Sequence, residues 1–96
     1  MTAITEQSYR TLAEAKGYGD PMQKTWEAGL YNEPHTHDVA LYLWIISGDL
    51  TLELADDTGA LDLTTIGPGE TIEVLANLLH TERPGADGVS FLVARK

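Results

Sequence analysis

The chain has 96 residues, no cysteine, and a formal net charge of −9 from 15 acidic and 6 basic side chains. This length predicts one domain with a modest core, and the lack of cysteine excludes disulfides and thiolate chemistry. An acidic surface repels nucleic acids and anionic membranes, so we expect neither as a partner. The N-terminus has no basic stretch followed by an apolar core, and no apolar run approaches the roughly 20 residues of a membrane span. We therefore expect a soluble, cytoplasmic protein.

Residues 1–21 predict an N-terminal arm that contains a short helix over residues 5–16. Thr5 is a suitable helix cap, and Tyr9, Leu12 and Ala13 share one face of such a helix. Helix-breaking residues follow, namely Gly17, Gly19 and Pro21. An irregular arm fits the same residues.

Residues 22–96 consist of short apolar runs, rich in β-branched and aromatic residues and separated by turn residues. This pattern predicts an antiparallel barrel or sandwich. Leu50, Leu52 and Leu54 alternate with polar residues and share one face of a strand, and Leu61 and Leu63 do the same. The cluster at residues 56–59 between these runs predicts a hairpin turn.

The run VALYLWII at residues 39–46 is apolar at both odd and even positions. Such a strand is buried on both faces, so something must cover each of them. Leu41 and Leu43 lie on one face, while Tyr42, Trp44 and Ile46 lie on the other. Either the N-terminal arm or a second copy of the chain would cover this second face.

Two of the three histidines, His35 and His37, stand at the mouth of this strand. If the chain is extended there, both rings point to one face, into the barrel. Imidazoles in an apolar cavity are costly unless a partner compensates, and a divalent metal ion does so. The third, His80, ends another apolar run that a neighbouring strand can bring to the same point. Their alternatives are a solvated turn for the pair and a surface loop for His80.

These residues resemble the two motifs of the cupins, a superfamily of small jelly-roll barrels. The first motif, Gly, His-x-His, Glu and Gly, is matched in spacing by Gly29, His35-Thr36-His37, Leu41 and Gly48. The second, Gly, Pro-x-Gly, His and Asn, is matched in spacing by Gly69, Leu75-Ala76-Asn77, His80 and Pro84, where Leu75 and Asn77 replace the Pro and Gly and Pro84 replaces the Asn. The resemblance covers residues 22–95. It implies an all-β jelly-roll barrel over residues 22–96, similar to small single-domain bacterial cupins of the RmlC-like kind.

The resemblance also implies that His35, His37 and His80 bind a divalent transition metal, whether Fe, Ni, Mn or Zn. Leu41 stands where the family usually has a carboxylate ligand. Glu33 and Glu82 each lie two residues from one of these histidines, so either one is a candidate to replace that carboxylate. Glu82 is the better candidate and the one candidate catalytic residue, although pairing with Arg83 on the surface is the more ordinary role for it. A cupin that has lost its metal is a further alternative.

The implied functions are those of the family. A metal-dependent enzyme, dioxygenase-like or lyase-like, would act on a small molecule in a cavity walled by Leu41, Leu43 and Leu52. The alternative is a non-catalytic module that binds or senses a small ligand, so whether the chain is an enzyme stays open. Trp26, Tyr42 and Trp44 are either a substrate-stacking wall or core residues. Because cupins commonly pair through the outer face of the barrel, we also expect a homodimer.

Overall fold

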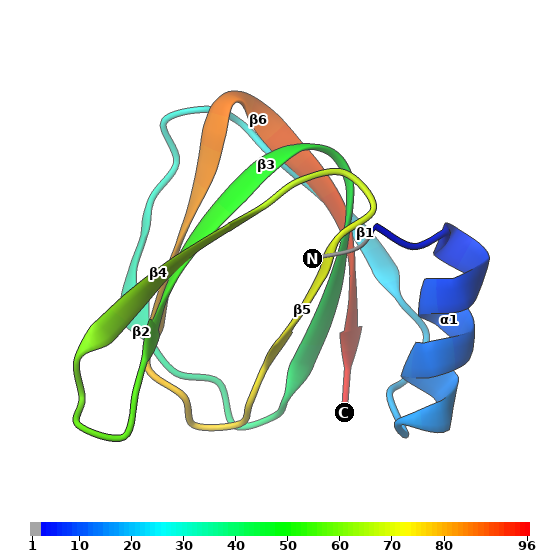
Figure 1. The fold of residues 1–96 in the computed structure, drawn as a ribbon, viewed down its shortest axis with the longest axis horizontal. Coiled ribbons are helices and arrows are strands. Elements are labelled where there is room, and N and C mark those ends of the chain that lie inside the picture. Colours follow the sequence, from blue (N-terminus) through cyan, green and yellow to red (C-terminus); the bar gives the residue numbers. More distant parts are fainter. Residues whose placement is uncertain (1–2) are drawn as a thin grey trace.

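The computed structural model describes residues 3–96, in which strands form a barrel and one helix, α1 (Glu6–Ala15), lies outside it (Figure 1). Thr5 caps the helix, because its side-chain oxygen accepts a hydrogen bond from the Ser8 backbone N–H at 3.1 Å. Tyr9 and Ala13 are fully buried against the barrel, but Leu12 is 42% exposed. The prediction that Leu12 shares the buried face was therefore wrong. At about 100° per residue, Leu12 lies roughly 60° from Tyr9 on the side away from Ala13.

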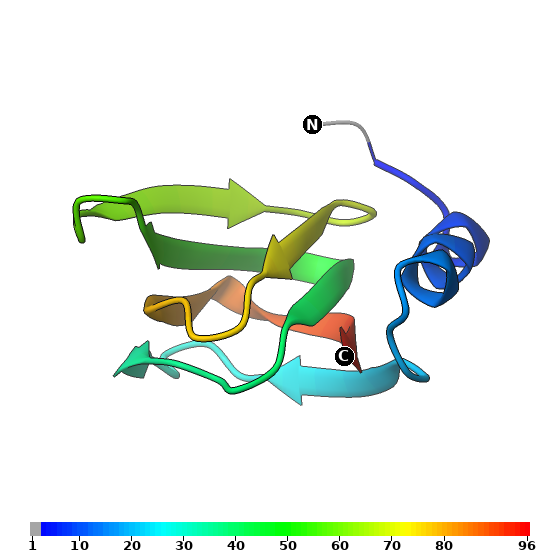
Figure 2. The ribbon, with the colours of Figure 1, turned by 90° about the horizontal axis from the view of Figure 1, so that it is seen from below.

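The barrel is one antiparallel six-stranded sheet built around two long strands. In chain order the strands are β1 (Met22–Trp26), β2 (Asn32–His35), β3 (Leu41–Ala55), β4 (Leu61–Ile66), β5 (Thr71–Val74) and β6 (His80–Arg95). The first half of β3 pairs with β5 and its second half with β4, while β6 pairs first with β2 and then with β1. β3 and β6 also pair with each other, so the two long strands join the four short ones into one sheet (Figure 2). The predicted all-β jelly-roll barrel with a short N-terminal helix is confirmed.

The two long strands bend where their register shifts, between Ile45 and Leu50. Gly48 lies at this corner with φ of 75°, in the left-handed region. A Cβ added at Gly48 would be 2.1 Å from the backbone oxygen of Gly88. Only glycine allows the two backbones to approach so closely.

Ile46 of the run VALYLWII is 36% exposed, but up to Ile45 the strand, which begins at Leu41, is covered on both faces as predicted. Its inner face belongs to the barrel core, which consists of Leu41, Leu43, Ile45, Leu50, Leu52, Ile66, Val74, Val89, Phe91 and Val93. Its outer face packs under α1 in a second cluster of Tyr9, Ala13, Tyr18, Tyr42, Leu92 and Ala94. The N-terminal arm therefore covers Tyr42, the first of the residues that suggested a second copy of the chain.

The hairpin predicted at residues 56–59 joins β3 to β4, with the Asp56 N–H donating to the Ala60 carbonyl at 2.8 Å. Leu61 and Leu63 share a face, but it is the outer one, and Leu63 is 70% exposed. The reason lies in the register, because Leu63 stands opposite Glu53 and facing residues of a sheet point the same way. No helix within residues 3–96 is long and apolar enough to cross a membrane.

Candidate metal centre

The three histidines converge at one end of the barrel. His35 is the last residue of β2, and its register partner on β6 is His80, so the pairing of these two strands joins both rings. The ring centroids of His35 and His80 are 4.3 Å apart, and that of His37 lies 4.9 Å from the first and 5.2 Å from the second. The prediction that a neighbouring strand brings His80 to His35 and His37 is confirmed.

His37 lies beyond the end of β2, in the connection to β3. Its carbonyl accepts a hydrogen bond from the Asn77 N–H at 2.7 Å. Asn77 has φ of 63° and replaces the glycine of the second cupin motif. Asparagine tolerates this left-handed conformation better than most residues, so the loop before β6 keeps the geometry that holds His37.

Two of the imidazoles have a defined tautomer. The Nδ1 of His35 is 2.6 Å from the Glu33 carbonyl oxygen, and the Nδ1 of His80 is 2.9 Å from that of Leu78. A carbonyl oxygen only accepts, so Nδ1 carries the proton in both rings. In the neutral ring the lone pair is then on Nε2, which is the arrangement of a metal-binding imidazole held by a backbone acceptor.

The Nε2 of His80 is fully buried and has no hydrogen-bond partner within residues 3–96. A buried polar nitrogen without a partner costs about 1–3 kcal/mol. The nearest acidic oxygen, on Glu82, is 3.8 Å away and beyond hydrogen-bond distance, so this nitrogen is available to a ligand from outside the chain. The donor set thus fits a metal ion on the evidence of the residues themselves.

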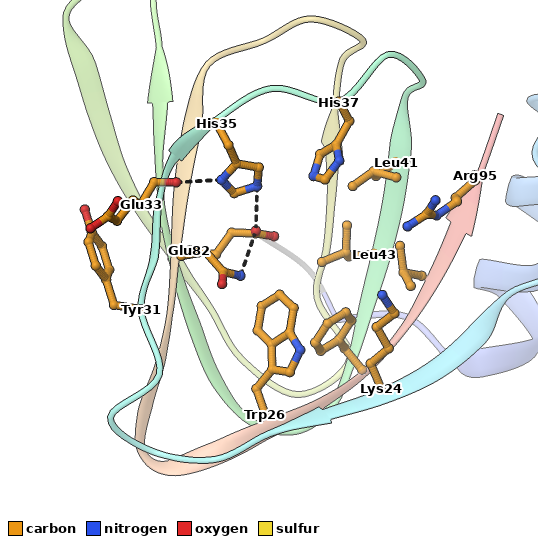
Figure 3. A pocket seen from close by; sticks show the side chains of 13 residues that line it. Lys24, Trp26, Tyr31, Glu33, His35, His37, Leu41, Leu43, Glu82 and Arg95 are labelled. Atoms are coloured by element: carbon orange, nitrogen blue, oxygen red, sulfur yellow. Dashed lines mark hydrogen bonds and ion pairs between the residues drawn. The ribbon is translucent and has the colours of Figure 1, made fainter.

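Glu82 completes the group. It follows His80 by two residues on β6, on the same inner face, and is only 4% exposed. One carboxylate oxygen lies 3.3 Å from Nε2 of His35 and 3.8 Å from Nε2 of His80, and it accepts a hydrogen bond from Asn32 at 3.2 Å (Figure 3). The four ligand atoms of His35, His37, His80 and Glu82 all lie within 4.8 Å of one another.

Glu33 and Glu82, the two candidates for the missing carboxylate ligand, thus have different roles. Glu33 is exposed, and its backbone carbonyl rather than its carboxylate serves the site, by orienting His35. Glu82 is not a surface residue paired with Arg83, whose guanidinium instead lies 4.9 Å from the centroid of the Tyr31 ring. The clue in the sequence was the two-residue spacing from His80, which places both side chains on one face of a strand.

A cavity of about 440 Å³ adjoins the histidines. It is lined by Lys24, Trp26, Tyr31, Asn32, Glu33, His35, His37, Leu41, Leu43, Glu82, Phe91, Val93 and Arg95. Leu41 and Leu43 form part of its wall, as expected, but Leu52 lies in the core outside it. Trp26 faces the cavity, whereas Tyr42 and Trp44 pack against the N-terminal arm and are core residues.

The environment of the centre favours the neutral form of the His37 ring. Burial, followed by the neighbouring charges of His80 and His35, holds the pKa of His37 below its ordinary value of 6.5. Glu82 acts in the opposite direction and Arg95 in the same direction as burial. A neutral ring keeps its lone pair near pH 7, which metal binding requires.

The fold is similar to solved oxalate decarboxylase structures. A mutant of the Bacillus subtilis enzyme superposes with a TM-score of 0.72 and 21% identity over 79% of this chain and 20% of that chain. The formate complex of the Lactobacillus farciminis enzyme gives a TM-score of 0.70 and 23% identity over 77% of this chain and 22% of that one. The 96-residue chain therefore has the cupin fold.

The likeness covers only about a fifth of those longer chains. A further Bacillus subtilis structure, described by its Mn(II) centres, matches with a TM-score of 0.70 and 22% identity over 77% of this chain and 20% of that one. No protein-family model matches the sequence, and neither does any curated protein. At this level of identity the comparisons establish the cupin jelly roll, a fold that does not by itself define a chemistry.

Proposed function

We propose that this cupin binds one divalent transition metal ion through His35, His37, His80 and Glu82, and acts on a small molecule in the adjoining cavity. The observation that carries the proposal is the buried, unpartnered Nε2 of His80, directed at the other three side chains. Three nitrogens and one carboxylate oxygen suit Mn, Fe, Ni or Zn. The comparison with a Mn(II)-containing oxalate decarboxylase makes manganese the first metal to test.

In this proposal Glu82 replaces the carboxylate that Leu41 does not provide. Its negative charge compensates part of the charge of a divalent cation, which three neutral imidazoles do not. Asn32 holds the carboxylate in place through the 3.2 Å hydrogen bond, and the Glu33 and Leu78 carbonyls hold two of the rings. These supporting contacts fix the direction of the ligand atoms before a metal arrives.

A bound metal would supply Lewis-acid activation of a substrate oxygen, or a site for dioxygen chemistry. The chain supplies the surroundings. Leu41, Leu43 and Phe91 form an apolar wall that limits water on one side of the centre, and Glu82 is the carboxylate near the reacting group. We therefore propose a dioxygenase-like or lyase-like reaction, with a non-catalytic ligand-binding cupin as the alternative.

The first test is metal content. Purified protein, stripped with chelator and reconstituted separately with Mn, Fe, Ni and Zn, should hold about one equivalent of at least one of them. Glu82→Gln should bind the metal more weakly. Glu73→Gln, which alters a carboxylate outside the site, is its matched control. Less than about a tenth of an equivalent of every metal would overturn the proposal.

Turnover separates the enzyme from the binding module. Oxygen consumption and carbon dioxide release are measured with metal-loaded protein and a panel of small carboxylic acids, diketones, thiols and catechols. Turnover that disappears in His80→Gln supports the enzyme. Saturable binding of a panel member without turnover supports the alternative.

Three further expectations stay predictions: the RmlC-like subgroup, the cytoplasmic location and the homodimer. Because Tyr42 packs under α1, a homodimer needs another surface. Sedimentation velocity at tens of micromolar tests this expectation, and a single species of twice the monomer mass is the expected outcome.

A further inference from the structure

The cationic side chains of this acidic protein fall into two groups. Of the 6 Lys and Arg residues, four have a partner. These four are Arg10, paired with Glu6; Lys16, paired with Glu73; Arg83, over the Tyr31 ring; and Lys96, over the Tyr18 ring. Within the described chain, Lys24 and Arg95 have neither an ion pair nor an aromatic ring beneath them. Both of these line the cavity next to the histidines.

Their positions in the sheet direct them inward. Lys24 on β1 stands opposite Phe91, and Arg95 at the end of β6 stands opposite Leu41. Phe91 and Leu41 are buried on the inner face of the barrel, and facing residues of a sheet share a face. An inward position on such a strand ordinarily takes an apolar side chain. Lys24 is moreover half-buried, which has a desolvation cost for an ammonium group without a counter-charge.

The cavity is also divided by charge. In Figure 3, Glu33 and Glu82 lie on one side of the view and Lys24 and Arg95 on the other, with Trp26, His37 and Leu43 between them. Lys24 extends from β1 toward the part of the cavity in which the Arg95 side chain lies (Figure 3). Lys24, which is half-buried, and Arg95, which is exposed, form a positive region along the cavity of a protein whose net charge is −9. An anion repelled by the general surface finds its complement here.

We propose that the cavity takes an organic anion with an apolar body. Its carboxylate or similar oxoanion head is held by Lys24 and Arg95, its body lies against Trp26, Leu43 and Phe91, and its other end reaches the histidines. This inference rests on the proposed function for the identity of the reacting end, but the head-group site depends only on Lys24 and Arg95.

The shape of the cavity selects within the anions. A volume of about 440 Å³ is in the range of pockets that hold molecules of more than a few heavy atoms. Leucine, valine and aromatic side chains provide its middle, so a ligand polar along its whole length would leave polar groups unpaired. An anion with a single charged end and an apolar body satisfies both ends and the middle at once.

The test uses phenylacetate as the probe and phenylacetamide as its uncharged counterpart, titrated by calorimetry into metal-loaded protein. Lys24→Met and Arg95→Met remove one charge each and keep a long apolar side chain. Lys16→Met and Arg83→Met remove equal charges outside the cavity and are the matched controls. The metal content of every variant is measured on the same samples.

The expected result is that phenylacetate binds more tightly than phenylacetamide. Each cavity variant should weaken phenylacetate binding by about tenfold, the loss of one charge-assisted hydrogen bond, and leave phenylacetamide unchanged. The controls should alter neither. Equal binding of both probes, no detectable binding of either, or a preference for the anion that survives in the Lys24→Met/Arg95→Met double variant would overturn the inference. If the metal content is full in any of these cases, the anion inference fails and the metal proposal stands. If metal-free protein still prefers phenylacetate to phenylacetamide, the anion site stands independently of the metal.

Discussion

The two faces of the central β3–β6 pair treat their polar groups in opposite ways. On the outer face, under α1, the Tyr9 hydroxyl donates to the Tyr42 carbonyl at 2.7 Å and the Trp44 indole donates to the Ile4 carbonyl at 3.0 Å. The Tyr18 hydroxyl likewise donates to Glu73 at 2.8 Å. On the inner face, at the histidine end, the Nε2 of His80 has no hydrogen-bond partner among the described residues.

This difference indicates that the outer face serves stability and the histidine end of the inner face serves ligand binding. A buried polar atom that is paired adds to stability or is neutral, whereas an unpaired one subtracts from it. The outer face therefore behaves as a second core that attaches the helix to the barrel. The inner end carries the cost of an unpaired nitrogen that a bound ligand would offset, and it adjoins a cavity. Substitutions that disrupt one face should therefore leave the other intact.

The largest effect is expected on the outer face. Tyr9 is fully buried, so Tyr9→Ala should lower the free energy of unfolding by about 3–5 kcal/mol, through lost packing and the cavity left behind. Denaturant titration measures this. Leu12→Ala, on the same helix at an exposed position, should change stability by no more than about 0.5 kcal/mol. Metal affinity should be the same in both variants, and a fall in affinity for Tyr9→Ala at a temperature where it is folded would mean that the two faces are coupled.

For His80→Gln we expect the opposite pattern, a large loss of metal affinity with little change in stability. Removal of one ligand nitrogen should weaken metal binding by about 100-fold or more, equal to roughly 2.7 kcal/mol. In the presence of chelator the thermal stability should fall only slightly, because the substitution removes the hydrogen bond from Nδ1 to the Leu78 carbonyl, worth about 1 kcal/mol, together with the unpaired Nε2. Chelator-competition titration and melting curves are the two measurements. Unaltered metal affinity would show that the metal, if bound, lies elsewhere.

An intermediate effect is expected from the carboxylate. Glu82→Gln should weaken metal binding by about tenfold, or roughly 1.4 kcal/mol, because the charge is lost while the shape is kept. Leu41 lines the same cavity and is 5% exposed, so Leu41→Glu should restore binding in the Glu82→Gln background. In the wild-type background it should add little, since Glu82 already supplies a carboxylate.

Two controls accompany that pair. Glu73→Gln should leave the metal affinity unchanged, because this carboxylate contacts Tyr18 and Lys16 on the outer face. Without metal, Leu41→Glu should lower the melting temperature, since a carboxylate in an apolar pocket is desolvated. Failure of Leu41→Glu to rescue Glu82→Gln would show that position 41 does not reach the ligand atoms.

The smallest effect is expected from pH. The pH range over which the free energy of unfolding changes should differ between the two faces. Burial holds the pKa of His37 below 6.5 in the folded chain, so the unfolded chain binds this proton first as the pH falls. In chelator, the free energy of unfolding should decrease as the pH drops from 6.5 to that lowered pKa. The hydrogen bond from Tyr18 lowers the pKa of Glu73, so its contribution is present above 4.5 and is lost only below that value.

Urea titrations at a series of pH values measure both windows. His37→Asn should remove part of the slope near pH 6, and Glu73→Gln should remove part of the slope below pH 4.5. An unchanged slope near pH 6 in His37→Asn would contradict the assignment to this ring.

Local patterns in the sequence were enough for the elements and for three members of the centre. The capping Thr5, the alternation of Leu50 and Leu52, and the turn at residues 56–59 act within a few neighbours, so they appear in the structure where they were expected. The spacing of His35 and His37 and the position of His80 at a strand end are of the same kind. They predicted which side chains would meet, because strand geometry alone sets which residues share a face.

Only the tertiary structure decided which faces are covered and by what. Contacts between distant segments decide the exposure of Leu12 and Leu63 and the packing of α1 over Tyr42. They also bring Glu82 into the histidine group and place Lys24 and Arg95 at the cavity. Period-two alternation tells which residues share a face but not whether that face is inside or outside. That choice is made by strand register, which sets Leu63 opposite Glu53 and His35 opposite His80, and it is determined by the packing of the whole barrel.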